Sequence, residues 1–417
     1  MKKPASPFIL YLSHPHLRAV QVSFTFLLLV LFACLLPFPL PPYLDFQVLY
    51  HADLGLLQGI PLYDRAGQAE MIARFAGVTP DRVFVLPFPY PPWYALSTVY
   101  LALPPAEVAA RLWFGMNVLM LAGSVWLITN REKPKSKSKD SGRWLRSFAK
   151  MVVYYFLAIL FVPALGSLYV GQYVFPVLLG AALLTFSLRR ENAALAALAS
   201  ALLTFKPHLG GPLAVAALIY LFLRRDDFSR RALKAIFVTA IFLFALGFLA
   251  DPAWPVNYLR SLLGFRDIPG VSSCGLCASL PVALVGLATG QTSIAPALWL
   301  GVALFIASAA ALGYFRRDLF RAPESVVSIA ALVTLLADPY LLNYDFTLLL
   351  APLFLLSARI AARRVDWPWL GIAYLLPAFL LGVFGRGGNL FLPLTAMLLL
   401  SYQILRAKPI DVSPREA

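Results

Sequence analysis

Long runs of apolar residues, separated by short polar or basic segments, make up most of this sequence of 417 residues. A helix of about 20 such residues is long enough to cross the hydrocarbon core of a bilayer. The apolar runs are continuous and do not alternate with a period of two, which argues against a membrane β-barrel. The pattern therefore predicts an all-α, polytopic membrane protein.

About twelve of these runs fit membrane spans, which places both termini on the cytoplasmic side. The first run is too long for a signal peptide and lacks a small-residue cleavage site, so we expect it to stay in the mature protein. The spans are expected at residues 19–40, 107–129, 151–168, 173–188, 192–205, 210–223, 235–250, 295–314, 326–336, 346–356, 367–384 and 390–405.

Residues 84–103 are also apolar, but a crossing there would move the basic segment 131–150 to the outside. Prolines open and close this stretch, and proline-broken backbone at membrane depth survives only where protein or a wet cavity surrounds it. We expect a partly inserted helix that does not cross, and residues 278–289 are a second candidate for such a piece.

Two long connections, residues 41–87 and 251–294, are expected on the outer face of a single membrane domain formed by residues 1–417. In the first connection, Phe46, Leu49 and Tyr50 follow Asp45 at helical spacing. This spacing predicts interfacial helices in the first outer loop, lying along the membrane surface.

Composition and charge narrow the function classes. With 60% hydrophobic and 13% charged residues, the chain is not a water-soluble enzyme. The net charge of +15 comes from basic residues that cluster between spans, above all in the expected cytoplasmic loop 131–150. The positive-inside rule explains this excess, so no nucleic-acid partner is implied.

Asp45 and Lys206 are the most informative polar residues of the expected outer face. Asp45 either caps its helix, where its negative charge interacts favourably with the helix dipole, or acts as a general base in apolar surroundings. Lys206 either extends its ammonium group to the lipid headgroups or binds an anionic headgroup in a half-dry site. Arg260, Arg266 and Arg386 are further candidate cations for a phosphate.

Other polar residues occur where expected spans end on the outer side. Gln172 can both donate to and accept from a hydroxyl-rich ligand. The late junction, residues 338–345, holds Asp338, Asn343, Tyr344 and Asp345, and charges at such depth favour a functional role.

Two cysteines form a short motif, Cys274-Gly-Leu-Cys277, in the connection 251–294. Such a motif is redox-active, half of a metal site or a disulfide, and we favour the disulfide in an oxidising compartment. The four histidines lack metal-ligand spacing and no nucleotide-binding loop is present, so we expect no metal and no cofactor.

Five short motifs occur in a characteristic order: GIPLYD at 59–64, YPPWYAL at 90–96, GQYVFPVLL at 171–179, LLTFKPHLG at 202–210 and DPYLLNYD at 338–345. In this order and spacing the chain, over roughly residues 19–405, resembles glycosyltransferase family 87. The chain departs from the family's pattern at 342–345, where relatives commonly have a Trp and one or two His.

The resemblance implies a GT-C membrane fold and a sugar donor linked to a polyprenyl phosphate, as in the family's mannosyltransferases. It implies that Asp45 is the catalytic carboxylate, Lys206 the contact to the lipid phosphate, and Gln172 and Tyr90 pocket residues. We add His208, Asn343, Tyr344 and Asp345 to the expected substrate pocket from their positions at the outer helix ends.

The expected function is transfer of a hexosyl group, expected to be mannosyl, from this donor to a lipid or glycan hydroxyl on the outer face of the cell membrane. Transfer would proceed with inversion, with Asp45 as general base. Two alternatives remain: a transporter or flippase of lipid-linked sugars, and a non-catalytic assembly subunit. A carrier needs polar groups near the middle of several spans, whereas an enzyme places its charges near one face.

Overall fold

A computed structural model describes residues 44–83, 85–129, 141–265, 268, 272–360 and 367–406. All regular secondary structure in these residues is helical, which confirms the all-α prediction for the part of the chain described. The first expected span, residues 19–40, lies outside the described residues.

The described residues form helices of different lengths along the chain. Those of the first half of the chain are α3 (Leu44–Leu57), α4 (Arg65–Ala76), η1 (Pro80–Arg82), α5 (Pro92–Thr98), η2 (Val99–Ala102), α6 (Ala106–Thr129), α7 (Ser141–Leu160), α8 (Val162–Val170), α9 (Val174–Arg190), α10 (Ala193–Leu203) and α11 (Pro207–Arg224). Those of the second half are α12 (Asp227–Gly247), α13 (Trp254–Phe265), α14 (Leu280–Thr289), α15 (Ile294–Phe315), η3 (Arg317–Arg321), α16 (Pro323–Ala337), η4 (Asn343–Leu349), α17 (Leu350–Ile360), α18 (Trp367–Phe384), η6 (Gly385–Phe391) and α19 (Pro393–Arg406).

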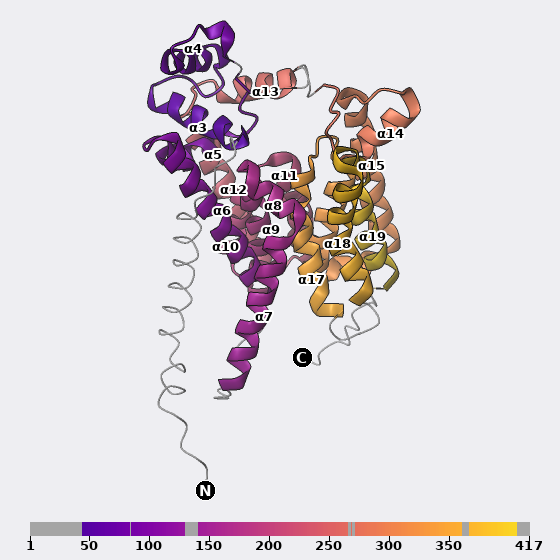
Figure 1. Ribbon diagram of the computed structural model, residues 1–417. Helices are drawn as coiled ribbons and strands as arrows, with labels where there is room; N and C mark the ends of the chain where they lie inside the picture. Colours follow the sequence, from indigo (N-terminus) through magenta and orange to yellow (C-terminus); the bar gives the residue numbers. More distant parts are fainter. Residues whose placement is uncertain are drawn as a thin grey trace.

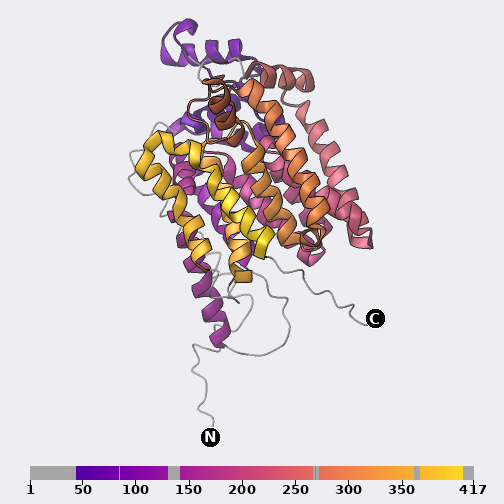
Figure 2. The same cartoon turned by 90° about the vertical axis from the view of Figure 1, so that its right-hand side faces the viewer.

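The long helices pack side by side in one bundle, as Figure 1 shows. Helices α4, α13 and α14 lie at the end of the bundle that is drawn uppermost, and α7 extends below the bundle at the opposite end (Figures 1 and 2). We call these the upper and the lower end. Because α9 and α11 begin at the upper end and run down the bundle, the connections before them both lie at the upper end (Figure 1).

Four helices are long and apolar enough to cross a membrane, namely α6, α11, α15 and the segment that starts with α18. Helices α7 and α8 pass the same test as a pair bent by 67°, which is either a broken fifth span or a re-entrant piece. The bend falls just before Pro163, which has no N–H to donate back into α7. The chain therefore has the helices of a membrane protein, while the count of twelve spans stays a prediction.

The segments that we expected not to cross form short helices. Between residues 85 and 103 the structure has only α5 and η2, and α5 begins at Pro92 in its first turn. Helix α14, in the second candidate segment, has 10 residues. Both are shorter than the length of about 20 residues that a crossing needs, as is α10 with 11 residues in the expected span 192–205.

The three expected connections are largely structured where the structure describes them. Residues 41–87 contain α3 and α4, and residues 251–294 contain α13 and α14. The basic segment 131–150 lies partly outside the described residues, and from Ser141 onward it forms the start of α7.

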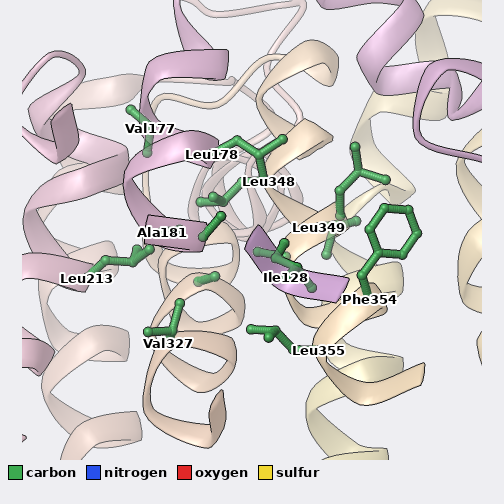
Figure 3. Packing of buried hydrophobic residues seen from close by; sticks show 14 of the residues in the cluster. Ile128, Val177, Leu178, Ala181, Leu213, Val327, Leu348, Leu349, Phe354 and Leu355 are labelled. Atoms are coloured by element: carbon green, nitrogen blue, oxygen red, sulfur yellow. The ribbon is translucent and has the colours of Figure 1, made fainter. Parts of the chain in front are cut away.

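The core of the bundle surrounds α9 and α16, which are buried on nearly all sides. A helix that is apolar all round lies in a protein core or spans a membrane, and α9 and α16 are covered by their neighbours. The alanine-rich helix α10 packs against α9, where small side chains let the two backbones approach closely. Figure 3 shows the contact of α9, α11, α16, η4 and α17 through Val177, Leu178, Ala181, Leu213, Val327, Leu348, Leu349, Phe354 and Leu355.

Ion pairs join helix ends at the lower end of the bundle. Arg189 at the end of α9 pairs with Glu324 at the start of α16, at 2.5 Å between Nε and Oε1. Arg224 at the end of α11 pairs with Glu191 and with Asp226. Basic residues outnumber acidic ones at these ends: Arg189, Arg190, Arg224, Arg225, Arg230, Arg231, Lys234, Arg316, Arg317 and Arg321 against Glu191, Asp226, Asp227, Asp318 and Glu324.

We predict that Gly210→Ala destabilises the protein, because a Cβ on Gly210 would lie 1.9 Å from the carbonyl oxygen of Leu203. Overpacking of this kind costs about 1–3 kcal/mol or more. The measurement is thermal unfolding of the purified protein in detergent. The matched control is Gly211→Ala, whose Cβ would meet no atom within 4 Å. Equal unfolding temperatures for the two variants would contradict the prediction.

Candidate active site

Four polar side chains from distant parts of the sequence form one hydrogen-bonded series at the upper end of the bundle. Gln172 Nε2 donates to Oδ2 of Asp45 at 2.8 Å. Lys206 Nζ donates to Oε1 of the same Gln172 at 3.0 Å and pairs with Oδ1 of Asp345 at 2.5 Å. Gln172 and Lys206 are each 3% exposed and Asp345 is 1% exposed. The series therefore contains two carboxylates, one ammonium and one amide, and most of it is shielded from solvent.

Asp45 lies in the first turn of α3, where its charge is favourable toward the helix dipole. Its side chain accepts from Gln172, so the position is compatible with the dipole role and also links α3 to the series. Burial raises the pKa of the Asp45 carboxyl, while the hydrogen bond from Gln172 and the charge of Lys206 lower it. The carboxyl of Asp45 thus has a raised proton affinity.

Gln172 occupies the short link between α8 and α9. Gly171 ends α8 in the left-handed conformation, with φ of 71°, which a residue without Cβ adopts at no steric cost. Helix α6 supports the link: Trp113 Nε1 donates to the carbonyl of Gly171 at 2.9 Å, and Asn117 Nδ2 donates to the carbonyl of Gln172 at 3.4 Å. These contacts fix the backbone from which the Gln172 side chain extends.

Lys206 is the N-cap residue of α11, and Pro207 follows in the first turn. Ser, Thr, Asn and Asp are the residues that favour an N-cap, and a positive charge there opposes the helix dipole. The Lys206 side chain makes no capping hydrogen bond. Local helix stability therefore does not explain this lysine, whereas its bonds to Gln172 and Asp345 do.

Asp345 lies in η4 and is held on both oxygens, since Oδ2 accepts from the backbone N–H of Leu342 at 3.0 Å. Ser167 of α8 ties η4 in place by donating to the carbonyl of Tyr344 at 2.9 Å and by a hydrogen bond with Thr347 at 2.8 Å. The carboxylate of Asp345 is therefore a fixed counter-ion of Lys206.

Tyrosines surround the series. The Tyr344 ring lies 5.2 Å from Lys206 Nζ, and its hydroxyl is close enough to the Asp45 carboxyl to lower the pKa of that group. The Tyr90 ring packs edge-on against that of Tyr173, with centroids 4.8 Å apart. The hydroxyls of Tyr90 and Tyr340 lie within electrostatic range of Asp45 and Asp345. The charged groups are thus surrounded by tyrosines, which combine apolar rings with polar hydroxyls.

Of the other expected site residues, some lie near the series without bonding to it. His208 lies in the first turn of α11 with its ring 6.4 Å from that of Tyr340, and its Nε2 has no hydrogen-bond partner. Asn343 opens η4 next to Tyr344 and makes no hydrogen bond with the four residues. Among the described residues, neither joins the hydrogen-bonded series.

The expected phosphate-binding arginines are less closely placed than Lys206. Arg260 on α13 and Arg386 in η6 are exposed. Within the described ranges, neither forms a hydrogen bond or ion pair with Asp45, Gln172 or Asp345. Arg266 lies outside the residues that the structure describes.

Cys274 and Cys277 are joined by a disulfide in a loop that packs on the late junction. Just after the disulfide, Ala278 N donates to the carbonyl of Leu341 at 2.7 Å, and Ser279 Oγ donates to the carbonyl of Asp338 at 2.8 Å. The loop therefore supports the backbone that leads to Asp345.

The sequence did not point to Tyr173 or Ser167. The hydroxyl of Tyr173 donates to the backbone carbonyl of Asp45 and accepts from the N–H of Leu49 at 3.2 Å, which ties α3 to α9. Tyr173 directly follows Gln172, so its place in the same motif was the available signal. Ser167 lies within an apolar run and gave no signal at all.

The buried charged residues of the described chain are Asp53, Lys206, Asp251, Asp338 and Asp345. Each lies in α3 or at a helix end or connection at the upper end of the bundle (Figure 1). No group of three or more His, Cys, Asp or Glu side chains placed to hold a metal ion occurs in the described part of the chain.

Apolar helices with a buried charged cluster at one end are typical of a membrane protein that acts at one face of the bilayer. The sequence model of glycosyltransferase family 87 matches residues 88–339, more than half of the chain. The chain therefore belongs to this family and is a membrane glycosyltransferase, which confirms the resemblance. No curated protein and no solved structure gives a significant match. The matched range includes Tyr90, Gln172 and Lys206 and ends before Asp345, while Asp45 precedes it.

We predict that Lys206→Met and Asp345→Leu each destabilise the protein strongly, because each leaves one charge buried without its partner. Breaking a buried pair costs about 3–5 kcal/mol, whereas replacing both partners by apolar residues is often close to neutral. The double variant should therefore unfold at a higher temperature than either single variant, measured in detergent.

The control for this cycle is the exposed pair Arg230 and Asp227 on α12. Removal of Asp227 should leave the unfolding temperature nearly unchanged, because exposed pairs contribute little. Additive losses in the double variant Lys206→Met, Asp345→Leu would contradict the coupling.

Proposed function

We propose that this glycosyltransferase moves a hexosyl group from a polyprenyl-phosphate-linked donor to a hydroxyl of a lipid or glycan acceptor. The hexosyl group of the proposal is mannosyl. The single observation that carries the proposal is the series Asp45–Gln172–Lys206–Asp345, in which a base candidate and a cation lie on either side of one amide. Family membership supplies glycosyl transfer, and the series supplies the groups for it.

Asp45 is the general base of the proposed reaction. It removes the proton from the acceptor hydroxyl as that oxygen attacks the anomeric carbon, and the bond from this carbon to the phosphate oxygen breaks. The polyprenyl phosphate leaves with the bonding electron pair, and the configuration at the anomeric carbon inverts. Its raised proton affinity suits Asp45 to this role, because burial makes the carboxylate a stronger base than in water.

Lys206 is the proposed contact to the donor phosphate. Its ammonium is neutralised by Asp345, so a phosphate that reaches it shares the cation with this carboxylate. Cationic stabilisation helps most where charge develops, which is on the leaving phosphate oxygen. Arg260, Arg266 and Arg386 remain proposed supplementary contacts for the lipid phosphate.

The remaining expected pocket residues complete the proposed substrate site. We assign Tyr90, Gln172, His208, Asn343, Tyr344 and Asp345 to it. Gln172 and Asp345 belong to the series, and the hydroxyls of Tyr90 and Tyr344 lie within electrostatic range of Asp45. His208 packs near Tyr340. This placement supports a site that offers hydrogen bonds to a hydroxyl-rich sugar.

The proposed setting is a GT-C fold of twelve spans with both termini in the cytoplasm and the site on the outer face of the cell membrane. The excess of arginine and lysine at the lower end supports this orientation, because positive charge is retained on the cytoplasmic side. The series at the upper end then lies on the side of the outer leaflet, and membrane lipids surround the bundle.

A carrier of lipid-linked sugars was the alternative to an enzyme. The buried charges of the described residues gather at the upper end, and the buried polar residues elsewhere in the bundle, such as Asn117 and Thr185, are uncharged. A translocation path needs polar groups near the centre of several spans. This placement supports transfer at one face over transport.

We predict that Asp45→Asn lowers the transfer rate by about 10²–10⁴-fold, because the base is lost while the hydrogen bond to Gln172 can be kept. The measurement uses purified protein, radiolabelled polyprenyl-phosphate-mannose and native lipid extract, with the labelled product identified. Asp81→Asn, which changes an exposed acid in η1, is the matched control with unchanged turnover. Near-normal transfer by a folded Asp45→Asn variant would remove the assignment.

We also predict the pH dependence of the wild-type protein. Because burial raises the pKa of Asp45, and because the base acts only when deprotonated, kcat/KM should fall as the pH drops through a value above the usual 3.8. This fall of kcat/KM at low pH, the acidic limb of the pH profile, should be absent from the residual activity of Asp45→Asn. An acidic limb with its midpoint at or below 3.8 would contradict the role of burial.

A further inference from the structure

The orientation of the Gln172 amide is determined by three contacts. Its Oε1 accepts from Lys206 Nζ and from the backbone N–H of Tyr173, each at 3.0 Å. Its Nε2 donates to Asp45 Oδ2 at 2.8 Å. A flipped amide would place its NH2 group against two donors and its carbonyl against a carboxylate. Only one orientation therefore satisfies all partners.

This orientation has two consequences for Asp45. One carboxylate oxygen is held by the amide, while the hydroxyl of Tyr173 holds the backbone of the same residue. The carboxylate is thus fixed relative to α9. Reacting groups must be held in this way, because a misplacement of about 1 Å can cost 10²-fold in rate.

The amide also keeps the two charges of the series apart. Lys206 bonds Gln172 and Asp345, so its ammonium does not pair directly with Asp45. A direct ion pair would stabilise the carboxylate and make it a weaker base. Asp345 neutralises the ammonium, and the neutral amide separates that pair from the base.

We infer that Gln172 is a positioning residue for the transfer reaction, which holds the Asp45 carboxylate in place and separates it from the Lys206–Asp345 ion pair. The inference rests on the proposed function, since it gives Asp45 the role of base. Gln172 acts through Asp45 and need not touch the reacting atoms.

The charged and titratable groups that face Asp45 come from the segment before α5, the link before α9, the start of α11 and the late junction; the other described elements packed on α3 contribute none that acts on Asp45. The facing groups are Tyr90, Tyr173, Lys206, Tyr340, Tyr344 and Asp345. None of them changes in a variant of Gln172. A change in the proton affinity of Asp45 in such a variant therefore reports the loss of the amide.

The test compares Gln172→Leu and Gln172→Glu with the wild type. Leu removes the hydrogen bond to Asp45 but still fills the space between Asp45 and Lys206, so the two charges stay apart. Glu keeps the shape but places a second acceptor and a negative charge beside Asp45. Both changes raise the pKa of Asp45, so the acidic limb of kcat/KM should move to higher pH, further for Glu than for Leu. For Gln172→Leu we expect kcat to fall by about 10²-fold and the KM for polyprenyl-phosphate-mannose to change by a smaller factor, since a residue that only bound the sugar would change KM first.

The matched control is Gln68→Leu on α4. Gln68 is also 3% exposed and donates one side-chain hydrogen bond, to the carbonyl of Leu62 at 2.7 Å, but it does not contact Asp45. This variant loses a similar buried bond. It should keep the wild-type acidic limb, whatever its unfolding temperature.

A second measurement needs no substrate. The infrared carboxyl band that is present in the wild type and missing in Asp45→Asn reports protonation of Asp45 in the purified protein. Its titration midpoint should move to higher pH in both Gln172 variants. An unchanged midpoint in the Gln172 variants would overturn the inference. The same holds if Gln172→Leu has the same kcat and the same acidic limb as Gln68→Leu. Transfer retained in Asp45→Asn would instead show that the proposed function is wrong.

Discussion

A buried ammonium cannot be left without a partner, and this constraint organises the upper end of the bundle. Lys206 is 3% exposed and lies at the start of a helix whose dipole opposes its charge. Asp345 and Gln172 satisfy it, and each comes from a different connection between helices. The link between α8 and α9, the start of α11 and η4 must therefore assemble together, because the desolvated charge is costly until all three are in place.

The apolar bundle makes this assembly rigid. Helices α9 and α16 are covered on nearly all sides, and close backbone contacts at Gly210 and Gly301 bring α11 and α15 against their neighbours. The disulfide loop and Ser167 then support the backbone around Asp345. Packing along the whole length of the bundle therefore holds the polar residues at its upper end in place. Such a rigid support is suitable for holding a base in a fixed position.

The sequence alone singles out all four members of the series but not their connections. Asp45, Gln172, Lys206 and Asp345 stood out because polar residues at the ends of apolar runs are rare and costly. Their bonds span 34 to 139 positions of the chain, so no spacing rule predicts them. The arginines show the converse: Arg260 and Arg386 carry the right charge, yet both are exposed, and neither bonds to the series.

The sequence by itself determined the helical class, the membrane setting and the family, because apolar periodicity, charge bias and short motifs are local properties of the chain. It also determined which end of the helices carries the unusual polar residues. Only the tertiary structure decided that Asp345 neutralises Lys206, that Gln172 stands between this pair and Asp45, and that Tyr173 joins α3 to α9. These are contacts between segments far apart in the chain, and they depend on how whole helices pack, which no local pattern encodes.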